Sequence, residues 1–446
     1  MAECSRQMSF SHLEKTPVVV DFDGGAITGD AGAVFLREVD EKLGLSANLA
    51  ACLLDRRDQT KVRHHRIEQV RQRVYQIACG YCDANDADTL RKDPAIKAAV
   101  GRAPVSTPDL ASQPSLSRLE NAGSAGEIGR MSHVLLQTWL RNRPRPTKAI
   151  VLDFDVTDDI VHGQQQFSFF SGFYGNYVYL PLLCYDGETG DLIALKLRPE
   201  NVHTGHGMLS MLKGIVRGIR ATWPGVEIIV RADAGFALPE LYEFCERRNL
   251  GYLIGFGSNR RLEALHAPLM AEAVRRYQAE GEKVRIIGEA GYRAGTWSRF
   301  RRLLMKAEAM PEGTNRRFVI TNLLADATLL FNFYNRRGDA ENRIKDLKRG
   351  LYADRLSCHR FQANSFRLLL HAAAYVLLHS LRSVSGDTEI ERSQFDILRL
   401  RLLKAGARVV ETSRKVWVHV SSTYPYRELW YRLHARLTIQ LPLPAS

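Results

Sequence analysis

The chain has 446 residues, with 62 lysine and arginine residues against 49 aspartate and glutamate residues, so its formal net charge is +13. Hydrophobic residues make up 45% of the chain, enough to bury sizeable cores, and this excludes wholesale disorder. The excess of positive charge favours nucleic acid as a partner but identifies no chemistry.

The sequence predicts no membrane-spanning segment. Its longest nearly apolar stretch, Leu368 to Leu381, contains two histidines and is shorter than the roughly 20 residues that a helix needs to cross a bilayer. Met1 to Phe10 lacks the apolar segment of a secretory signal. The seven cysteines, an odd number, fit a reducing compartment. We therefore expect a cytoplasmic protein with no membrane partner.

Residues 1–145 are predicted to form a mainly helical, basic region. In its Arg-rich run, Asp55 to Gln76, apolar residues recur at intervals of three to five, which is typical of an amphipathic helix or helix pair with a basic face. Such faces are usually only solvated, but the net charge favours contact with DNA here. Prolines interrupt the chain at Arg141 to Pro146, where we expect a domain boundary.

Residues 146–256 and 326–385 are predicted to form the two parts of an α/β core. Helices are expected before and after the fifth of six predicted strands, and three consecutive strands form a meander. The predicted strands are Ala149 to Val156, Gln166 to Phe170, Val178 to Tyr185, Leu192 to Arg198, Val226 to Asp233 and Gly251 to Phe256.

The two parts of the core are separated by residues 257–325, a charged and irregular segment with short apolar alternations that predicts a β-rich insertion. Helical patterns resume at Ala327 and continue through Gly350. Residues 386–446 are predicted to be a helical to mixed C-terminal region. The expected fold class is therefore α/β, with helical regions at both ends of the chain.

Acidic residues stand on or at the end of two of the predicted strands. Asp153 and Asp155 are alternate residues of one strand, so they share a face of the sheet. Asp233 closes the apolar run EIIVRAD, where a strand gives way to a helix. Strand ends of this kind are where sites are assembled in α/β sheets.

A third acidic position, Glu341, lies in a helical segment with a polar stripe. The members of the stripe follow one another at offsets of 0, 3, 7, 11 and 14, close to multiples of the helical period. They are Tyr334, Arg337, Glu341, Lys345 and Lys348. A stripe with a phenol, a guanidinium, a carboxylate and ammonium groups is not typical of a core.

Three carboxylates from separate segments can hold two divalent cations roughly 3.5 to 4 Å apart, and such a pair cuts phosphodiesters. Hard oxygen ligands suit Mg²⁺ or Mn²⁺. The basic stripe beside Glu341 would bind the phosphates of the substrate.

The spacing Tyr334-x2-Arg337-x3-Glu341-x6-Lys348 resembles the Tyr-Arg-Glu-Lys signature of DDE insertion-sequence transposases, whose ribonuclease-H-like core carries a β-strand insertion before its last Glu. The chain is most similar to the insertion-sequence family numbered thirteen-eighty. Segments that carry this resemblance are LDFDVTDDIVHGQQ, LRPENVH, VRADAGF and RGDAENRIKDLKRGLYADRLS. The resemblance covers most of the chain.

The resemblance implies an enzyme, a DNA transposase that binds terminal inverted repeats, cleaves the transposon ends and joins their 3′-OH groups to target DNA. It implies Asp155, Asp233 and Glu341 as ligands of two Mg²⁺ ions, with Mn²⁺ as a substitute. The Asp-x-Thr match with Thr157 favours Asp155 as the first ligand, and Asp153 is the alternative.

The same resemblance gives roles to the stripe and to the partners. Tyr334, Arg337 and Lys348 would position the terminal phosphates, with Tyr334 stacking on an unpaired base, and Lys345 is the alternative to Lys348. A homodimer would pair two transposon ends in a synaptic complex, at the nucleoid of a bacterial cell. A catalytically silent or nuclease-only relative that binds DNA is the second functional hypothesis.

Overall fold

The computed structural model describes residues 7–146 and 149–440, which belong to two compact units. The first unit combines the chain up to Gly123 with the chain from Ala373, and the second is Ser124–Ala372. The boundary differs from the one expected near residue 145. The reason is α7 (Ala125–Asn142), which starts in a capping box at Ser124 and packs its apolar face into the core of the second unit.

The first unit is mainly helical, as predicted. Its helices are α1 (Ala33–Leu43), α2 (Leu45–Ala51), α3 (Arg66–Ala78), α4 (Ala87–Leu90), α5 (Pro94–Val100), α6 (Gln113–Ala122), α14 (Phe395–Leu398) and α15 (Arg427–Gln440). A three-stranded sheet, in the order β16-β15-β3, brings together both ends of the chain. It consists of β3 (Ile27–Thr28), β15 (Ala407–Glu411) and β16 (Val416–Val420), and a separate hairpin of β1 (Met8–Leu13) and β2 (Thr16–Val20) precedes it.

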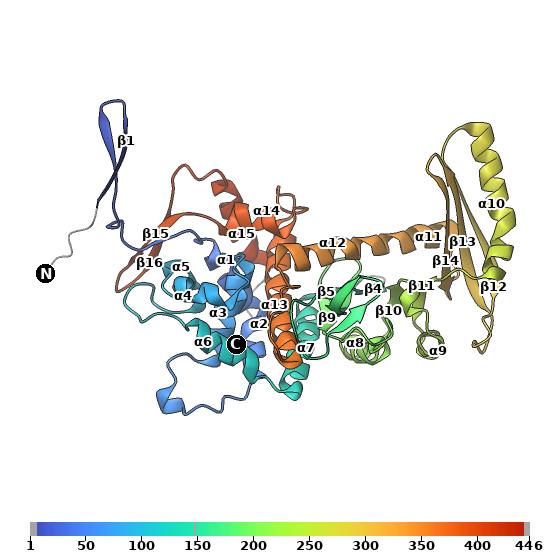
Figure 1. The fold of residues 1–446 in the computed structure, drawn as a ribbon, viewed down its shortest axis with the longest axis horizontal. Helices are drawn as coiled ribbons and strands as arrows, with labels where there is room; N and C mark the ends of the chain where they lie inside the picture. Colours follow the sequence, from blue (N-terminus) through green and yellow to red (C-terminus); the bar gives the residue numbers. More distant parts are fainter. Residues whose placement is uncertain (1–6, 147–148, 441–446) are drawn as a thin grey trace. The chain divides into compact units, whose positions relative to one another are not determined.

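The second unit is built on an eight-stranded mixed sheet in the order β12-β13-β14-β11-β10-β4-β8-β9 (Figure 1). Antiparallel pairing joins β9, β8 and β4, whereas β10 and β11 run parallel to β4. The five strands of this half are β4 (Ala149–Val156), β8 (Leu182–Asp186), β9 (Leu192–Lys196), β10 (Glu227–Ala232) and β11 (Gly251–Phe256). The predicted bounds of the first strand are confirmed, whereas the antiparallel set of β4, β8 and β9 leaves out the predicted strand Gln166 to Phe170, so it is not a meander of three consecutive predicted strands.

One predicted strand, Val178 to Tyr185, is two strands in the structure. Pro181 lacks a backbone N–H and lies between them. The first of the two, β7 (Asn176–Tyr179), leaves the large sheet and pairs with β5 (Asp159–Ile160) and β6 (Phe169–Ser171) in a small sheet of its own. The second is β8, which stays in the large sheet.

Alternation along the strands gives the large sheet two different faces. Residues such as Leu152, Val230 and Ile254 point toward α7, α8 (Met208–Thr222) and α9 (Pro239–Arg247) and form the main core with them. The alternate residues Ile229 and Leu253 pack against α11 (Ala327–Asn335) on the other face. Asp153 and Asp155 alternate with the main-core residues Leu152 and Phe154, so they lie on the face that α11 covers.

The predicted insertion extends the large sheet. Its strands β12 (Val284–Tyr292), β13 (Arg301–Met310) and β14 (Gly313–Thr321) follow one another in antiparallel order, and β14 pairs with β11. The segment also contains α10 (Arg260–Glu280), a helix that the sequence analysis did not predict. Few of its residues are buried and Pro268 lies inside it, so the helical period is weak in the sequence.

The core continues from α11 through a short 3₁₀ turn into α12 (Asp339–Lys345), which confirms the predicted helical run, and then into a π-helical turn at Asp346–Gly350. After it comes α13 (Phe361–Ser385), the one helix among the described residues that is long and apolar enough to cross a membrane. In its most apolar window 78% of the residues are buried inside the protein. This burial is typical of a core helix.

Candidate active site

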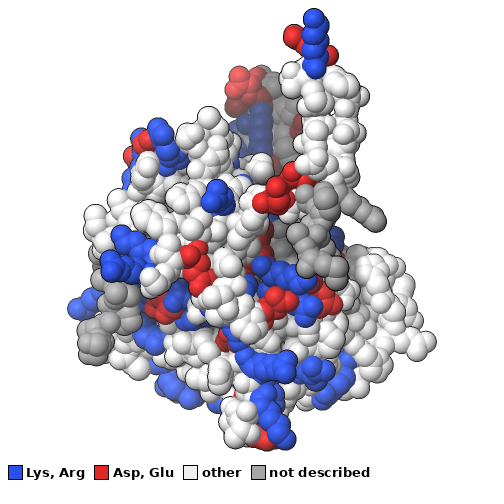
Figure 2. Space-filling view, turned by 90° about the vertical axis from the view of Figure 1, so that its left-hand side faces the viewer, with Lys and Arg blue, Asp and Glu red and all other residues white. Residues whose placement is uncertain are grey.

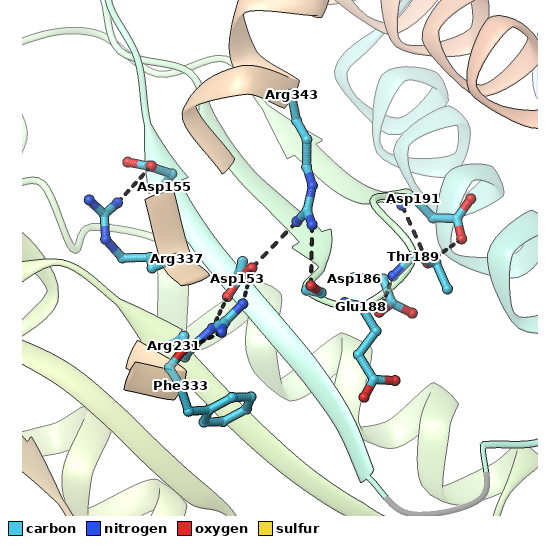
Figure 3. Close-up of polar contacts among 11 residues, drawn as sticks. Asp153, Asp155, Asp186, Glu188, Thr189, Asp191, Arg231, Phe333, Arg337 and Arg343 are labelled. Atoms are coloured by element: carbon cyan, nitrogen blue, oxygen red, sulfur yellow. Dashed lines mark hydrogen bonds and ion pairs between the residues drawn. The ribbon is translucent and has the colours of Figure 1, made fainter. Parts of the chain in front are cut away.

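The centre of the site is a buried ion pair between neighbouring strands. Parallel pairing puts Arg231 of β10 opposite Asp153 of β4, and its Nε and Nη2 donate to the two carboxylate oxygens at 2.6 and 2.7 Å. Both side chains are fully buried. A second guanidinium, of Arg343 in α12, lies 3.4 Å from the same carboxylate (Figure 3). Arg231 also donates to the carbonyl oxygen of Phe333 in α11 at 2.6 Å.

These contacts correct the expectation that Asp153 is a possible metal ligand. Its carboxylate already has two arginine partners and no exposed surface, and opening such a pair would leave a buried charge uncompensated. Asp153 therefore holds β4, β10 and the helices together. Asp155, two residues further along the same face, is the carboxylate that reaches the site.

Asp155 lies in an environment that disfavours its negative charge. Burial raises its pKa to about 6; the Arg337 guanidinium opposes this rise, and the charges of Asp233 and Glu341 add to it. The structure thus brings two of the sequence-predicted carboxylates, Asp233 and Glu341, within electrostatic reach of the third, Asp155. Their mutual repulsion is a condition that a bound cation would relieve.

Arg337 supplies positive charge between two of these carboxylates. Its Nη1 donates to Oδ2 of Asp155 at 2.9 Å, and its Nη2 lies 3.6 Å from Oε1 of Glu341 (Figure 3 shows the contact with Asp155). The Glu341 side chain is 62% exposed, so it remains accessible from solvent. The guanidinium therefore bridges a buried carboxylate and an exposed one.

Asp233 stands at the end of β10, where its Oδ1 accepts a hydrogen bond from the backbone N–H of Gly235 at 2.9 Å. It lines a cavity of about 330 Å³ together with Tyr334 and Arg337. Two further arginines of β14, Arg316 and Arg317, line the same cavity. The structure therefore adds two cations that the sequence analysis missed, since only the pairing of β14 with β11 brings them here.

The two added arginines differ in their partners. Arg316 forms an ion pair with Glu263 at 3.1 Å. Arg317 is exposed and has no ion-pair or hydrogen-bond partner within residues 7–146 and 149–440. Arg317 is thus the cation of this cavity that is free to bind an anion.

Tyr334 does not lie where a base could stack on it. Its side chain is 5% exposed and packs against Phe331 and Leu330 in the core between the sheet and α11. The stacking role expected for Tyr334 is therefore incompatible with its burial. Its hydroxyl borders the cavity, next to Gly255, where a methyl group would come within 2.6 Å of the hydroxyl oxygen.

The two lysines of the stripe have different environments. Lys345 belongs to α12, whereas Lys348 belongs to the π-helical turn that follows, where the helical spacing changes. Lys348 donates to the carbonyl oxygen and to Oδ1 of Asp158, at 2.5 and 3.0 Å. Lys345 is exposed and has no partner in the part of the chain that the structure describes. Only Lys348 is therefore fixed next to the strand that carries Asp155.

Among the described residues, no group of three or more His, Cys, Asp or Glu side chains is arranged to hold a metal ion. The donor atoms of Asp155, Asp233 and Glu341 are nevertheless of the type that a hard divalent cation requires. The like charges that raise the pKa of Asp155 also fit a cation site. The residues therefore fit such an ion in chemistry, and Arg337 supplies the positive charge in the arrangement seen.

In the first unit, part of the Arg-rich run lines a cavity of about 1050 Å³. Its cationic residues are Arg57, Lys61, Arg63, Arg91 and Arg102. Several have acidic partners, as Arg57 has in Asp55, whereas Arg63 is exposed and its side chain has no partner among the described residues. Figure 2 shows that lysines and arginines on the face it draws alternate with acidic and neutral residues, so the positive charge there forms no continuous band.

Replacing Asp153 should unfold the second unit more readily than replacing Asp155. Asp153→Ala leaves Arg231 buried without its partner, and we expect a loss of about 3–5 kcal/mol in the free energy of unfolding. Asp155→Asn removes a charge that burial disfavours, so it should not lower stability. Thermal melting followed by circular dichroism compares the two variants. Equal melting temperatures would contradict the structural role of Asp153.

One of three comparisons with known proteins identifies the family of this chain. No curated protein matches the chain. The cryo-EM structure of a piggyBac transposase synaptic complex with hairpin DNA is similar over 94% of this chain and 86% of that one, at 12% identity and a TM-score of 0.42, and no conclusion rests on a likeness of that size. The model of the family described as transposase DDE domain group 1 matches residues 10–441. The chain therefore belongs to this family and is a DNA transposase.

Proposed function

We propose that this chain is a cut-and-paste transposase that binds terminal inverted repeats, cleaves a phosphodiester at each transposon end and joins the freed 3′-OH to target DNA. The observation that carries the proposal is the convergence of Asp155, Asp233 and Glu341, since Arg337 contacts both Asp155 and Glu341, and the charges of Asp233 and Glu341 both act on Asp155. Family membership supports DNA as the substrate. The residue assignments rest on the geometry of the site.

The order of the strands supports a ribonuclease-H-like core. Three antiparallel strands, β9, β8 and β4, adjoin two strands that run parallel to β4. Asp155 comes from the central strand, Asp233 from the end of its parallel neighbour and Glu341 from a helix on the same face. The core thus delivers one carboxylate from each of three separate segments.

Asp155, Asp233 and Glu341 would hold two Mg²⁺ ions, for which Mn²⁺ substitutes. Such ions activate water and stabilise the leaving oxygen when they are bound. Arg337, which contacts Asp155 and Glu341, would neutralise these carboxylates before binding and then donate to a phosphate oxygen of the DNA. Its planar fork suits a phosphate better than a point charge does.

The remaining cations would position the DNA around the carboxylates. Lys348 is held at Asp158, three residues beyond Asp155, and Lys345 is exposed nearby on the same helical run. Arg317 faces the cavity that Asp233 lines. Tyr334 would act through its hydroxyl at that cavity. The proposal includes a homodimer that pairs two ends and a place at the nucleoid in a bacterial cytoplasm.

Loss of the carboxylate of Glu341 should abolish cleavage without abolishing DNA binding. We expect Glu341→Ala to cut a linear DNA with the transposon end at least about 100-fold more slowly in Mg²⁺ or Mn²⁺, because a metal ligand is lost. Glu312→Ala, at an exposed turn between β13 and β14, is the matched control. Cutting is measured on gels at matched occupancy of the DNA.

Two results of that experiment would favour the alternatives. A wild-type protein that binds paired ends and never cuts would be a silent DNA-binding relative. One that cuts but does not join a pre-cleaved end to target DNA would be a nuclease. Undiminished cleavage by Glu341→Ala would contradict the ligand assignment.

A methyl group at Gly255 should impair the same reaction. A Cβ there would come within 2.6 Å of the Tyr334 hydroxyl and 2.9 Å of the backbone nitrogen of Ala234, next to Asp233. Because small displacements of reacting groups are costly, we expect Gly255→Ala to lower the cleavage rate about 10- to 100-fold. Gly257→Ala, where no atom lies within 4 Å of the added carbon, should cleave normally. Equal rates for the two variants would argue against a constrained site.

The cavity of the first unit should contribute to binding through phosphate contacts. Arg63→Ala removes an exposed cation, so we expect weaker binding to duplex DNA of any sequence. The slope of the logarithm of the binding constant against the logarithm of the salt concentration is negative, and its magnitude should decrease by about 1. The control is Arg275→Ala, an exposed arginine of α10 that is paired with Glu272. Fluorescence anisotropy titrations at several salt concentrations measure the affinity and its salt dependence. An unchanged slope for Arg63→Ala would contradict DNA binding at this cavity.

A further inference from the structure

The small sheet of β5, β6 and β7 carries an unusual amount of exposed aromatic surface. Phe173, at the tip between β6 and β7, is 89% exposed, and Phe170 and Tyr177, which face each other across the two strands, are 57% and 55% exposed. Isolated exposed apolar residues are ordinary, but a contiguous group marks a binding surface. We call Phe170, Phe173, Tyr174 and Tyr177 the aromatic tip.

The rings of the aromatic tip form two edge-to-face pairs, and three of the four side chains are exposed, whereas Tyr174 is half-buried. The ring centroids of Phe170 and Tyr177 are 5.7 Å apart, and those of Phe173 and Tyr174 are 4.8 Å apart. The turn between the strands has Gly172 and Gly175 at its two ends, and no atom lies within 4 Å of a Cβ built at either. Gly175 has a φ of +66°, which permits the tight turn that holds Phe173 outward.

The opposite end of the small sheet is fixed. Tyr179 is fully buried, and its hydroxyl donates to the carbonyl oxygen of Gln166 at 2.7 Å. The backbone N–H of Gln166 in turn donates to the carbonyl oxygen of His359 at 2.9 Å. The aromatic tip is therefore the free end of an anchored hairpin.

The small sheet begins next to the catalytic carboxylates. Only three residues separate Asp155 from the start of β5, and Lys348 binds Asp158 within that interval. Burial raises the pKa of the Tyr174 hydroxyl, and the charges of Asp158, Asp155 and Asp233 raise it further. The phenol therefore lies within electrostatic reach of two of the proposed metal ligands.

The exposed rings of the aromatic tip are suited to binding flat, unpaired DNA bases. In the proposed function the site beside this surface receives the sugar-phosphate backbone, and Lys348, which is held at Asp158, lies at the base of the small sheet. Each deoxyribose next to a bound phosphate carries a base, and the flat faces of that base stack on aromatic rings when it is not paired. Tyr334, the stacking residue expected from sequence, is buried, whereas the aromatic tip is open.

We propose that the aromatic tip, with Phe173 at its centre, is the platform on which unpaired bases stack when a DNA end is held at the carboxylates. This inference rests on the proposed function and adds that the protein recognises DNA ends whose strands are separated. The enzyme would then prefer ends whose terminal base pairs are open, whatever their sequence. Phe173 is a positioning residue in this account, since it touches no reacting atom.

The test compares binding of forked and blunt DNA by the full-length protein. We expect wild type to bind a forked duplex with a short unpaired tail more tightly than a blunt duplex of the same sequence. Phe173→Ala should lose about tenfold in affinity for the forked duplex only, the usual contribution of one stacked base. Phe173→Trp should retain the preference. Phe300→Ala, at another exposed aromatic residue of the same unit, should bind like wild type.

A second measurement locates the bases directly. With 5-iodouracil in the unpaired tail, irradiation should crosslink the DNA to the segment 170–177, and Phe173→Ala should reduce this crosslink. Equal binding of the forked duplex by wild type and Phe173→Ala, with crosslinks elsewhere, would overturn the stacking platform and leave the proposed function intact. Wild type that binds neither duplex would overturn both. A Phe173→Ala protein that fails to self-associate, with unchanged DNA binding, would identify the tip as a dimer contact and overturn the inference.

Discussion

The buried pair of Arg231 and Asp153 is the interaction on which the site depends. Taking two charges out of water is costly, and the pair is tolerated because its geometry is bidentate and Arg231 has a further acceptor. One guanidinium fixes the register of β4 against β10 and also holds α11 through the carbonyl oxygen of Phe333. Arg343 of α12 also contacts Asp153, so the pair sets the positions of the segments that carry Asp155, Asp233 and Glu341.

The residues of the stripe share one helical spacing in the sequence, but their environments in the structure differ. The stripe of residues from Tyr334 to Lys348 divides into a buried phenol, a guanidinium between carboxylates, an exposed carboxylate and a lysine bound to Asp158. Asp153 and Asp155 also differ in their partners, since Asp153 has Arg231 opposite it and Asp155 contacts Arg337.

Local periodicity explains what could be predicted from the sequence. Alternation gave the strand of Asp153 and Asp155, and the helical period gave the run from Ala327 to Gly350, because both patterns need only neighbouring residues. The partner of Asp153 is 78 residues away, and Arg317 reaches the cavity only through the pairing of β14 with β11. Such long-range pairing also decides the burial of Tyr334, so none of these features could be predicted from periodicity.

The pairing of β14 with β11 has a consequence for solubility. Without it, β11 would end the sheet with a row of unpaired backbone groups, a template for aggregation beside the candidate site. The added strands move this boundary outward to β12, whose residues include the charged Arg285 and Glu289. Charged side chains on an outer strand discourage pairing with another chain. The extra segment therefore protects the core as well as supplying arginines to it.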